Sequence, residues 1–355
     1  MQASTPAASR LSRIFALDYL RGFFIVVIII DHLWRWPNVL QLISGRGELW
    51  ASAAEGFVII SGLLVGYVRG YKNRHDPLKT VSGKLIRRGL MLYLWMLITT
   101  FGLVAATWLF HFKGSIAHVP IEPFAWSQLI HDVFNLTYVH SLTHFLYLYA
   151  IFLIISPLVI WLLRQGKWWL VIAASFLTWL LGTYVGLEWM QWQILFFVPA
   201  AAGYYLDKIF DRYYNLPLVT RRSIRYSSII LTLSTAAYAM SLVFAYAPGE
   251  YDNSLFSREM VTLPIILTAF IWFAGLLSLT QFLLPYIRKP FGWLLRVFGE
   301  RSLTAYILHV IPLLVCQWFF GDTLNIWVNT LLTILVIFAT WALLKIPGIN
   351  RVVPR

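Results

Sequence analysis

The chain has 355 residues, of which 59% are hydrophobic and only 12% are charged. This composition is too apolar for an ordinary soluble domain and predicts an all-α integral membrane protein that crosses the bilayer several times. The formal net charge of +13 also occurs in nucleic-acid-binding proteins, but the basic residues follow the membrane topology described below, so we expect no nucleic-acid partner. The single cysteine, Cys316, excludes a disulfide framework and a multi-cysteine metal site.

The first apolar segment, residues 14–34, is long enough to span a bilayer and carries Asp18, Arg21, Asp31 and His32. We expect it to be retained, because no short apolar core with a small-residue cleavage site precedes it. Ionisable groups in hydrocarbon cost about 3 kcal/mol each on insertion scales, so they are candidates for function. Arg21 and His32 are eleven residues apart, which places them about 16 Å apart along the helix and on nearly the same face.

Nine further apolar runs follow, separated by charged, proline-containing or glycine-containing connections, and the total is ten spans with both termini cytoplasmic. The runs lie near residues 53–71, 86–110, 143–163, 168–187, 189–207, 226–246, 259–283, 294–319 and 324–344.

The basic residues support this topology. All but five of the 28 Lys and Arg residues fall on the segments that ten spans place in the cytoplasm. The five exceptions are Arg21 inside the first span and Arg35, Arg46, Lys113 and Arg258 outside. The longest external connection covers about residues 111–142, and we expect it to fold over the outer face. Without internal repeats or a flexible linker, residues 1–355 are expected to form a single transmembrane domain.

The second span begins with SAAEGFVIISG, which places Glu55 near the depth of His32. The functional interpretation makes His32 a general base that takes a proton from a substrate hydroxyl, while Glu55 holds the imidazole in the required tautomer. The alternative is that His32 and Asp31 only mark the membrane interface. The presence of Arg21 and Glu55 favours the functional interpretation.

At the start of the third span, KLIRRGLMLY places Arg87 and Arg88 at a depth comparable with that of Arg21. Three guanidinium groups with planar, bidentate donors would suit the phosphates of an acyl-CoA supplied by the cytoplasm. The positive-inside rule alone also explains arginines at this position.

Further polar and aromatic residues lie near the external ends of the spans or inside them. Tyr138, His140 and His144 precede or begin the fourth span and are candidates for stabilising an oxyanion or contacting substrate. His309 is expected near mid-membrane, as a functional residue or as an interhelical hydrogen-bonding residue. Trp36 belongs to a set of outer aromatic residues that suits either an interfacial belt or a sugar-stacking surface.

Together these residues resemble the acyltransferase-3 superfamily of membrane acyltransferases, and within it the OpgC-like branch, which is associated with succinylation of periplasmic glucans. Arg21 and His32 match its Arg-x10-His signature, and LDYLRG, AEGFVIISG, the Arg87–Arg88 pair and GERSLTAYILH resemble its other motifs. The resemblance covers nearly the whole chain and includes the count of ten helices. The second-span motif has Glu55 and Gly56 where many superfamily members have aspartate and phenylalanines, which favours the OpgC-like branch.

The resemblance implies transfer of an acyl group from a cytoplasmic thioester donor to a hydroxyl of an extracytoplasmic glycan, with His32 catalytic and the arginines near the donor. We therefore expect a bacterial inner-membrane O-acyltransferase that uses acyl-CoA as donor substrate and binds no permanent cofactor. The acyl group stays open between succinyl and acetyl. The alternatives are a transmembrane N-acetyltransferase acting on amino sugars and a transporter of glycans or lipid-linked sugars.

Overall fold

The computed structural model describes residues 6–110, 119–256, 260–321, 323–349 and 353–354, and none of these residues forms a strand. The first part of the expected external loop, residues 111–118, lies outside the described residues. The helices are α1 (Pro6–Leu33), α2 (Gln41–Ser44), α3 (Ala53–Leu64), α4 (Leu78–Phe110), α5 (Trp126–Phe134), α6 (His144–Arg164), α7 (Trp168–Val185), α8 (Glu188–Trp192), α9 (Ile194–Tyr204), α10 (Leu206–Asn215), α11 (Leu218–Val243), α12 (Leu263–Glu300), α13 (Ser302–Leu308), α14 (Val310–Phe319) and α15 (Ile326–Lys345). The π-helical segment η2 (Val65–Lys72) extends α3, and short 3-10 turns cover η1 (Gly45–Gly47), η4 (Ser141–Thr143) and η5 (Ser254–Phe256).

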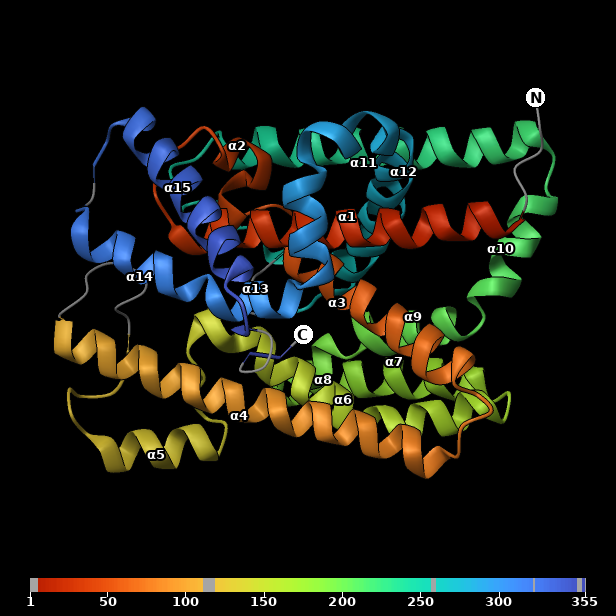
Figure 1. The fold of residues 1–355 in the computed structure, drawn as a ribbon, viewed down its shortest axis with the longest axis horizontal. Coiled ribbons are helices and arrows are strands. Elements are labelled where there is room, and N and C mark those ends of the chain that lie inside the picture. The colour runs from red at the N-terminus through yellow and green to blue at the C-terminus, as the bar shows by residue number, and fades with distance from the viewer. Residues whose placement is uncertain (1–5, 111–118, 257–259, 322, 350–352, 355) are drawn as a thin grey trace.

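Eight helical segments in the described part of the chain are long and apolar enough to cross a membrane. The expectation of an all-helical membrane protein is therefore confirmed, and the count of ten spans and the cytoplasmic termini stay predictions. The eight do not include α1, whose apolar run carries Asp18, Arg21 and Asp31, or the expected span 189–207, which is divided into α8 and α9. Figure 1 shows α1, α4 and α11 running along the long axis of the molecule.

Two helices continue beyond the apolar runs that were expected to span the membrane. The third span was expected from residue 86, but α4 begins at Leu78, since lysine and arginine are good helix formers. The expected spans 259–283 and 294–319 are also divided differently. Helix α12 continues through Pro285 and Pro290 to Glu300, and α13 and α14 form the next segment.

The end of α12 packs directly on α1. A Cβ atom added to Gly22 of α1 would lie 1.9 Å from the carbonyl oxygen of Leu295, and one added to Gly299 of α12 would lie 1.8 Å from the carbonyl oxygen of Asp18. Small residues at such a contact let two membrane helices approach at backbone distance. The contact places the start of α13, which follows α12, beside the middle of α1.

A second close contact joins α3 and its extension η2 to α9. Gly62 and Gly66 are four residues apart and face the carbonyl oxygens of Phe196 and Ala200, while Gly203 of α9 faces that of Leu63. This is the small-xxx-small pattern that mediates close packing of membrane helices.

The connection between α4 and α6 contains helix α5, which packs along α4 (Figure 1). Leu129 and Val133 of α5 are fully buried, and Trp126 contacts Trp108 of α4 edge to face, with 4.9 Å between the ring centroids. Part of the expected external loop is therefore an ordered helix.

The glycine contact generates a stability prediction. In Gly66→Ala the added Cβ would lie 1.9 Å from the Ala200 carbonyl oxygen, so α3 and α9 must separate. We expect destabilisation of about 1–3 kcal/mol, seen as a lower thermal midpoint of the detergent-purified protein. The matched control is Gly83→Ala in α4, where nothing lies within 4 Å of the added Cβ. It should leave the midpoint unchanged or raise it, because alanine favours helix. Equal midpoints for the two variants would contradict this account of the packing.

Candidate active site

The last turn of α1 presents His32 to α13 and α14. The Nδ1 atom of His32 lies 2.8 Å from the Nε2 atom of His309, and the ring centroids are 5.0 Å apart. His309 is fully buried, and its Nδ1 atom is hydrogen-bonded to the backbone carbonyl oxygen of Tyr306. His309 therefore lies inside the bundle, as expected, and it is the direct partner of His32.

The hydrogen bonds decide which ring nitrogen carries each proton. A carbonyl oxygen only accepts, so Nδ1 of His309 donates to Tyr306, and Nε2 of neutral His309 is an acceptor. Nδ1 of His32 therefore donates to His309, which leaves Nε2 of neutral His32 with a lone pair. This arrangement suits a general base: when Nε2 gains a proton, the imidazolium keeps its Nδ1–H bond to His309.

The predicted orienting residue, Glu55, has a different partner. Its Oε2 atom accepts from the backbone N–H of Ser52 at 2.8 Å and from the Ser52 hydroxyl, and the Ser52 hydroxyl accepts from the backbone N–H of Ala54. Ser52 and Glu55 thus form a capping box that begins α3. The expectation that Glu55 holds the tautomer of His32 is corrected, because His309 occupies that position.

Arg21 lies in the middle of α1 and faces a polar cavity. Its Nη2 atom donates to the hydroxyl of Ser302, and its guanidinium carbon lies 5.5 Å from the centroid of the Phe57 ring. The cavity encloses about 150 Å³, and Arg21, Arg69 and Arg88 all line it. Among the described residues, no carboxylate lines this cavity, so three cationic groups share one space.

The polar lining of this cavity includes buried atoms without a hydrogen-bond partner among the described residues. The Nε atom of Arg21 and the hydroxyl of Ser61 have no hydrogen-bond partner among the described residues, and both residues line the cavity. Buried polar groups normally have partners, so such atoms indicate a ligand or water. The charge and the unsatisfied N–H together fit an anion such as phosphate.

The structure separates the two adjacent arginines of α4. Arg88 lines the cavity, whereas Arg87 is exposed and lies outside it, because successive helical residues point about 100° apart. The sequence predicted a cluster of Arg21, Arg87 and Arg88. The structure instead brings Arg69 together with Arg21 and Arg88, and Arg87 is not part of the cluster. Arg69 belongs to the π-helical segment η2, a type of segment often found at functional sites.

A column of aromatic rings links the arginine cavity to the histidine pair. The Phe57 ring contacts Arg21, and its centroid is 4.9 Å from that of Phe145. Phe145 is 5.4 Å from Tyr306, and Tyr306 is 6.1 Å from His32. All three aromatic side chains are buried. The cationic group and the basic group are thus separated by apolar packing.

The remaining predicted site residues fall into two groups. His140 is buried, and its Nδ1 atom accepts from the backbone N–H of Leu142 at 3.3 Å. The hydroxyl of Tyr138 is buried without a hydrogen-bond partner among the described residues, and burial raises its pKa to about 12. It therefore stays protonated at neutral pH and is available to donate.

The other two predicted residues have partners away from His32. His144 bonds to Glu188 at 2.7 Å. Trp36 packs against Arg46 and Phe244.

The basic residues that follow α1 serve structural roles. Arg35 donates to the carbonyl oxygens of Phe320 and Gly321. Arg46 donates to those of Val243 and Tyr246 and pairs with Glu48 at 3.1 Å.

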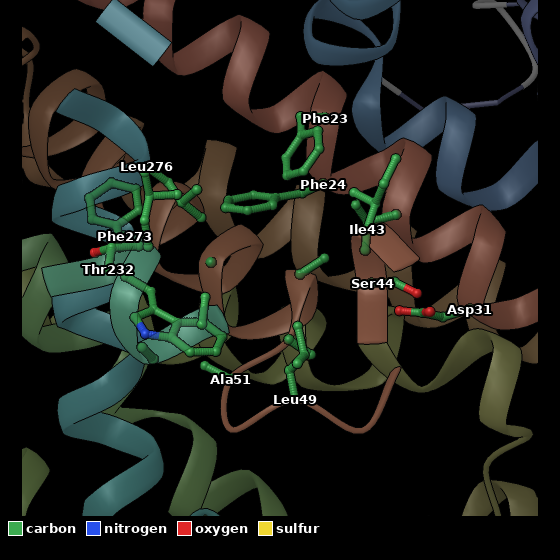
Figure 2. A pocket seen from close by; sticks show the side chains of 18 residues that line it. Phe23, Phe24, Asp31, Ile43, Ser44, Leu49, Ala51, Thr232, Phe273 and Leu276 are labelled. Atoms are coloured by element: carbon green, nitrogen blue, oxygen red, sulfur yellow. The ribbon is translucent and has the colours of Figure 1, made fainter. Parts of the chain in front are cut away.

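A separate apolar cavity of about 130 Å³ lies between α1, α3, α11 and α12. Figure 2 shows Phe273 and Leu276 at one end and Asp31 and Ser44 at the other. Asp31 thus faces this cavity, while the next residue, His32, faces His309. The cavity holds none of the residues expected to act in catalysis or donor binding.

Comparison with known proteins gives one match. The family model described as OpgC protein covers residues 13–347. No curated protein and no solved structure matches the chain. The matched region contains every residue of the histidine pair, the arginine cavity and the aromatic column. Because the match covers nearly the whole sequence, the chain belongs to the OpgC family, and this membership indicates a membrane acyltransferase that acts on osmoregulated periplasmic glucans.

Proposed function

We propose that the protein transfers a succinyl or acetyl group from a cytoplasmic acyl-CoA to a hydroxyl of an extracytoplasmic glycan in a bacterial inner membrane. The observation that carries this proposal is the hydrogen-bonded chain from His32 through His309 to the Tyr306 carbonyl oxygen. It gives His32 the tautomer that a general base requires. Arg21 and His32 also lie on one helix in the Arg-x10-His arrangement of acyltransferase-3 proteins.

His32 acts first as base and then as acid. Its Nε2 atom takes the proton of the glycan hydroxyl as that oxygen attacks the thioester carbonyl carbon. The C–S bond then breaks, the departing sulfur takes the proton from the imidazolium, and the products are the glycan ester and free CoA. Tyr138 and His140 are the candidates for donating to the oxyanion.

The donor phosphates bind between Arg21, Arg69 and Arg88. These side chains supply positive charge, and Arg21 Nε and the Ser61 hydroxyl supply hydrogen-bonding atoms that lack a partner among the described residues. The pantetheine arm extends from there along the aromatic column of Phe57, Phe145 and Tyr306. The rise of about 16 Å between Arg21 and His32 is comparable with the length of an extended arm.

Replacement of the base tests the chemistry. We expect His32→Ala to lower acyl transfer by about 10²–10⁴-fold, the usual contribution of general acid–base catalysis. The measurement is radiolabel transfer from succinyl-CoA and acetyl-CoA to periplasmic glucan, with folded protein quantified in the same membranes. Undiminished transfer by His32→Ala would contradict the role of His32. No transfer from either donor by well-folded wild-type protein would favour the transporter alternative.

His309 is a positioning residue, and its variants test that role. We expect His309→Leu to lower kcat by about 10²-fold, because His32 loses the acceptor that orients it. His309→Gln keeps an acceptor oxygen and should recover part of this loss. The KM for acyl-CoA should be unchanged in both variants. Equal kcat values for the two variants, or a change confined to KM, would contradict the positioning role.

The arginine cavity is tested by donor binding rather than by turnover. We expect Arg21→Ala and Arg69→Ala each to weaken acyl-CoA binding by about 10-fold or more, because each removes charge-assisted hydrogen bonds. The measurement is the Kd of radiolabelled acyl-CoA by equilibrium dialysis. The matched control is Arg87→Ala, which removes the same charge from the exposed face of α4 and should leave the Kd unchanged. A larger effect from Arg87→Ala than from Arg69→Ala would place the phosphates elsewhere.

A further inference from the structure

A third cavity lies at the beginning of α3 and encloses about 190 Å³. It is bounded by the connection that follows α1, by the end of α8, by η5 and by the start of α12. One ordered water needs about 10–15 Å³ on this measure, so the cavity has room for about a dozen heavy atoms, the number in one hexose unit. Its walls combine the aromatic residues Trp50, Trp192 and Phe256 with the polar residues Ser52 and Glu55.

The aromatic wall is rigid. The ring of Trp50 stacks on that of Phe256, with centroids 4.5 Å apart and planes 6° apart. Its indole N–H donates to the hydroxyl of Tyr251 at 3.1 Å, and Asn253 also donates to that hydroxyl. Trp50 and Trp192 are both half-buried, so part of each ring is available to a ligand. A fixed apolar ring binds the C–H face of a sugar with little loss of side-chain entropy.

The polar wall accepts hydrogen bonds. Glu55 is 8% exposed, and both bonds from Ser52 end on its Oε2 atom. Its Oε1 atom accepts no hydrogen bond from a described residue, so it is available to a ligand hydroxyl. None of the described residues that line the cavity is basic. The carboxylate therefore disfavours anions, including the phosphates of acyl-CoA, and favours a neutral polyhydroxyl ligand.

The cavity lies on the connection between α1 and α3, at the end of α1 that carries His32. Trp50 and Ser52 belong to the connection that begins after Leu33, one residue beyond His32. A glycan acceptor is a polymer, so units remote from the acylated one can supply binding energy that orients the reacting hydroxyl.

We propose that this cavity is a glycan subsite that holds one neutral sugar unit between Trp50, Trp192 and Glu55, an inference that rests on the proposed function. The carboxylate expected to act on His32 thus has two tasks here: it caps α3 and accepts a hydroxyl of the acceptor chain.

The test is direct binding of a tritium-labelled, neutral gluco-oligosaccharide of about five units to the full-length protein in nanodiscs. We expect Trp192→Ala to weaken binding by about 10-fold, through loss of ring contact. Glu55→Gln should also weaken it several-fold, because hydrogen bonds to a charged acceptor are stronger than those to a neutral one. Glutamine at this position still closes the capping box, so α3 is preserved. The matched control is Trp126→Ala on α5, which removes an indole that is 43% exposed and outside the cavity.

The outcomes separate this inference from the proposed function. Wild-type affinity in both Trp192→Ala and Glu55→Gln would overturn the subsite, as would bound label that unlabelled oligosaccharide fails to displace. If the wild-type protein binds acyl-CoA and transfers its acyl group to glucan, but Trp192→Ala and Glu55→Gln leave the KM for glucan unchanged, the subsite falls and the proposed function stands. If the oligosaccharide binds as expected but no acyl group is transferred, the proposed function falls and the subsite stands.

Discussion

Hydrocarbon does not solvate a guanidinium or an imidazole, so the helices around α1 must supply partners for Arg21 and His32. Ser302 and the Phe57 ring provide them for Arg21, and His309 provides one for His32. These partners lie on α3, α13 and the turn before α14. The backbone contacts at Gly22 and Gly299 bring the end of α12 against α1 and so place α13 within reach. Close packing of these helices therefore also brings the polar partners of Arg21 and His32 into place.

As a result, α1 contributes to two polar sites that differ in chemistry. The cavity of Arg21, Arg69 and Arg88 favours anions, whereas the histidine pair provides a lone pair that accepts a proton. The buried aromatic side chains of Phe57, Phe145 and Tyr306 pack between them. Such a division suits a reaction in which a charged donor and a sugar acceptor approach from different sides and only an acyl group is exchanged. Exclusion of water also protects a thioester from hydrolysis.

Sequence spacing was sufficient where function depends on one helix. The eleven-residue interval predicted that Arg21 and His32 share a face, and the apolar runs predicted most helices. Contacts between distant segments were not predictable in this way: His309 is 277 residues from His32. The capping role of Glu55 was readable in SAAE, residues 52–55, because a serine followed three residues later by glutamate is a helix-start signal. Which of Arg87 and Arg88 faces the cavity depends on the orientation of the helix. The position of Arg69 depends on a π-helical segment, which hydrophobic periodicity does not reveal.

The central claim is that donor and acceptor react across the bilayer through one protein. The most direct measurement uses sealed proteoliposomes with protein in a single orientation, radiolabelled acyl-CoA on the Arg21 side and glucan on the His32 side. The account predicts labelled glucan in this arrangement, dependence on His32, and no labelling when the two substrates exchange sides. Labelling only when both substrates are on the same side would contradict it.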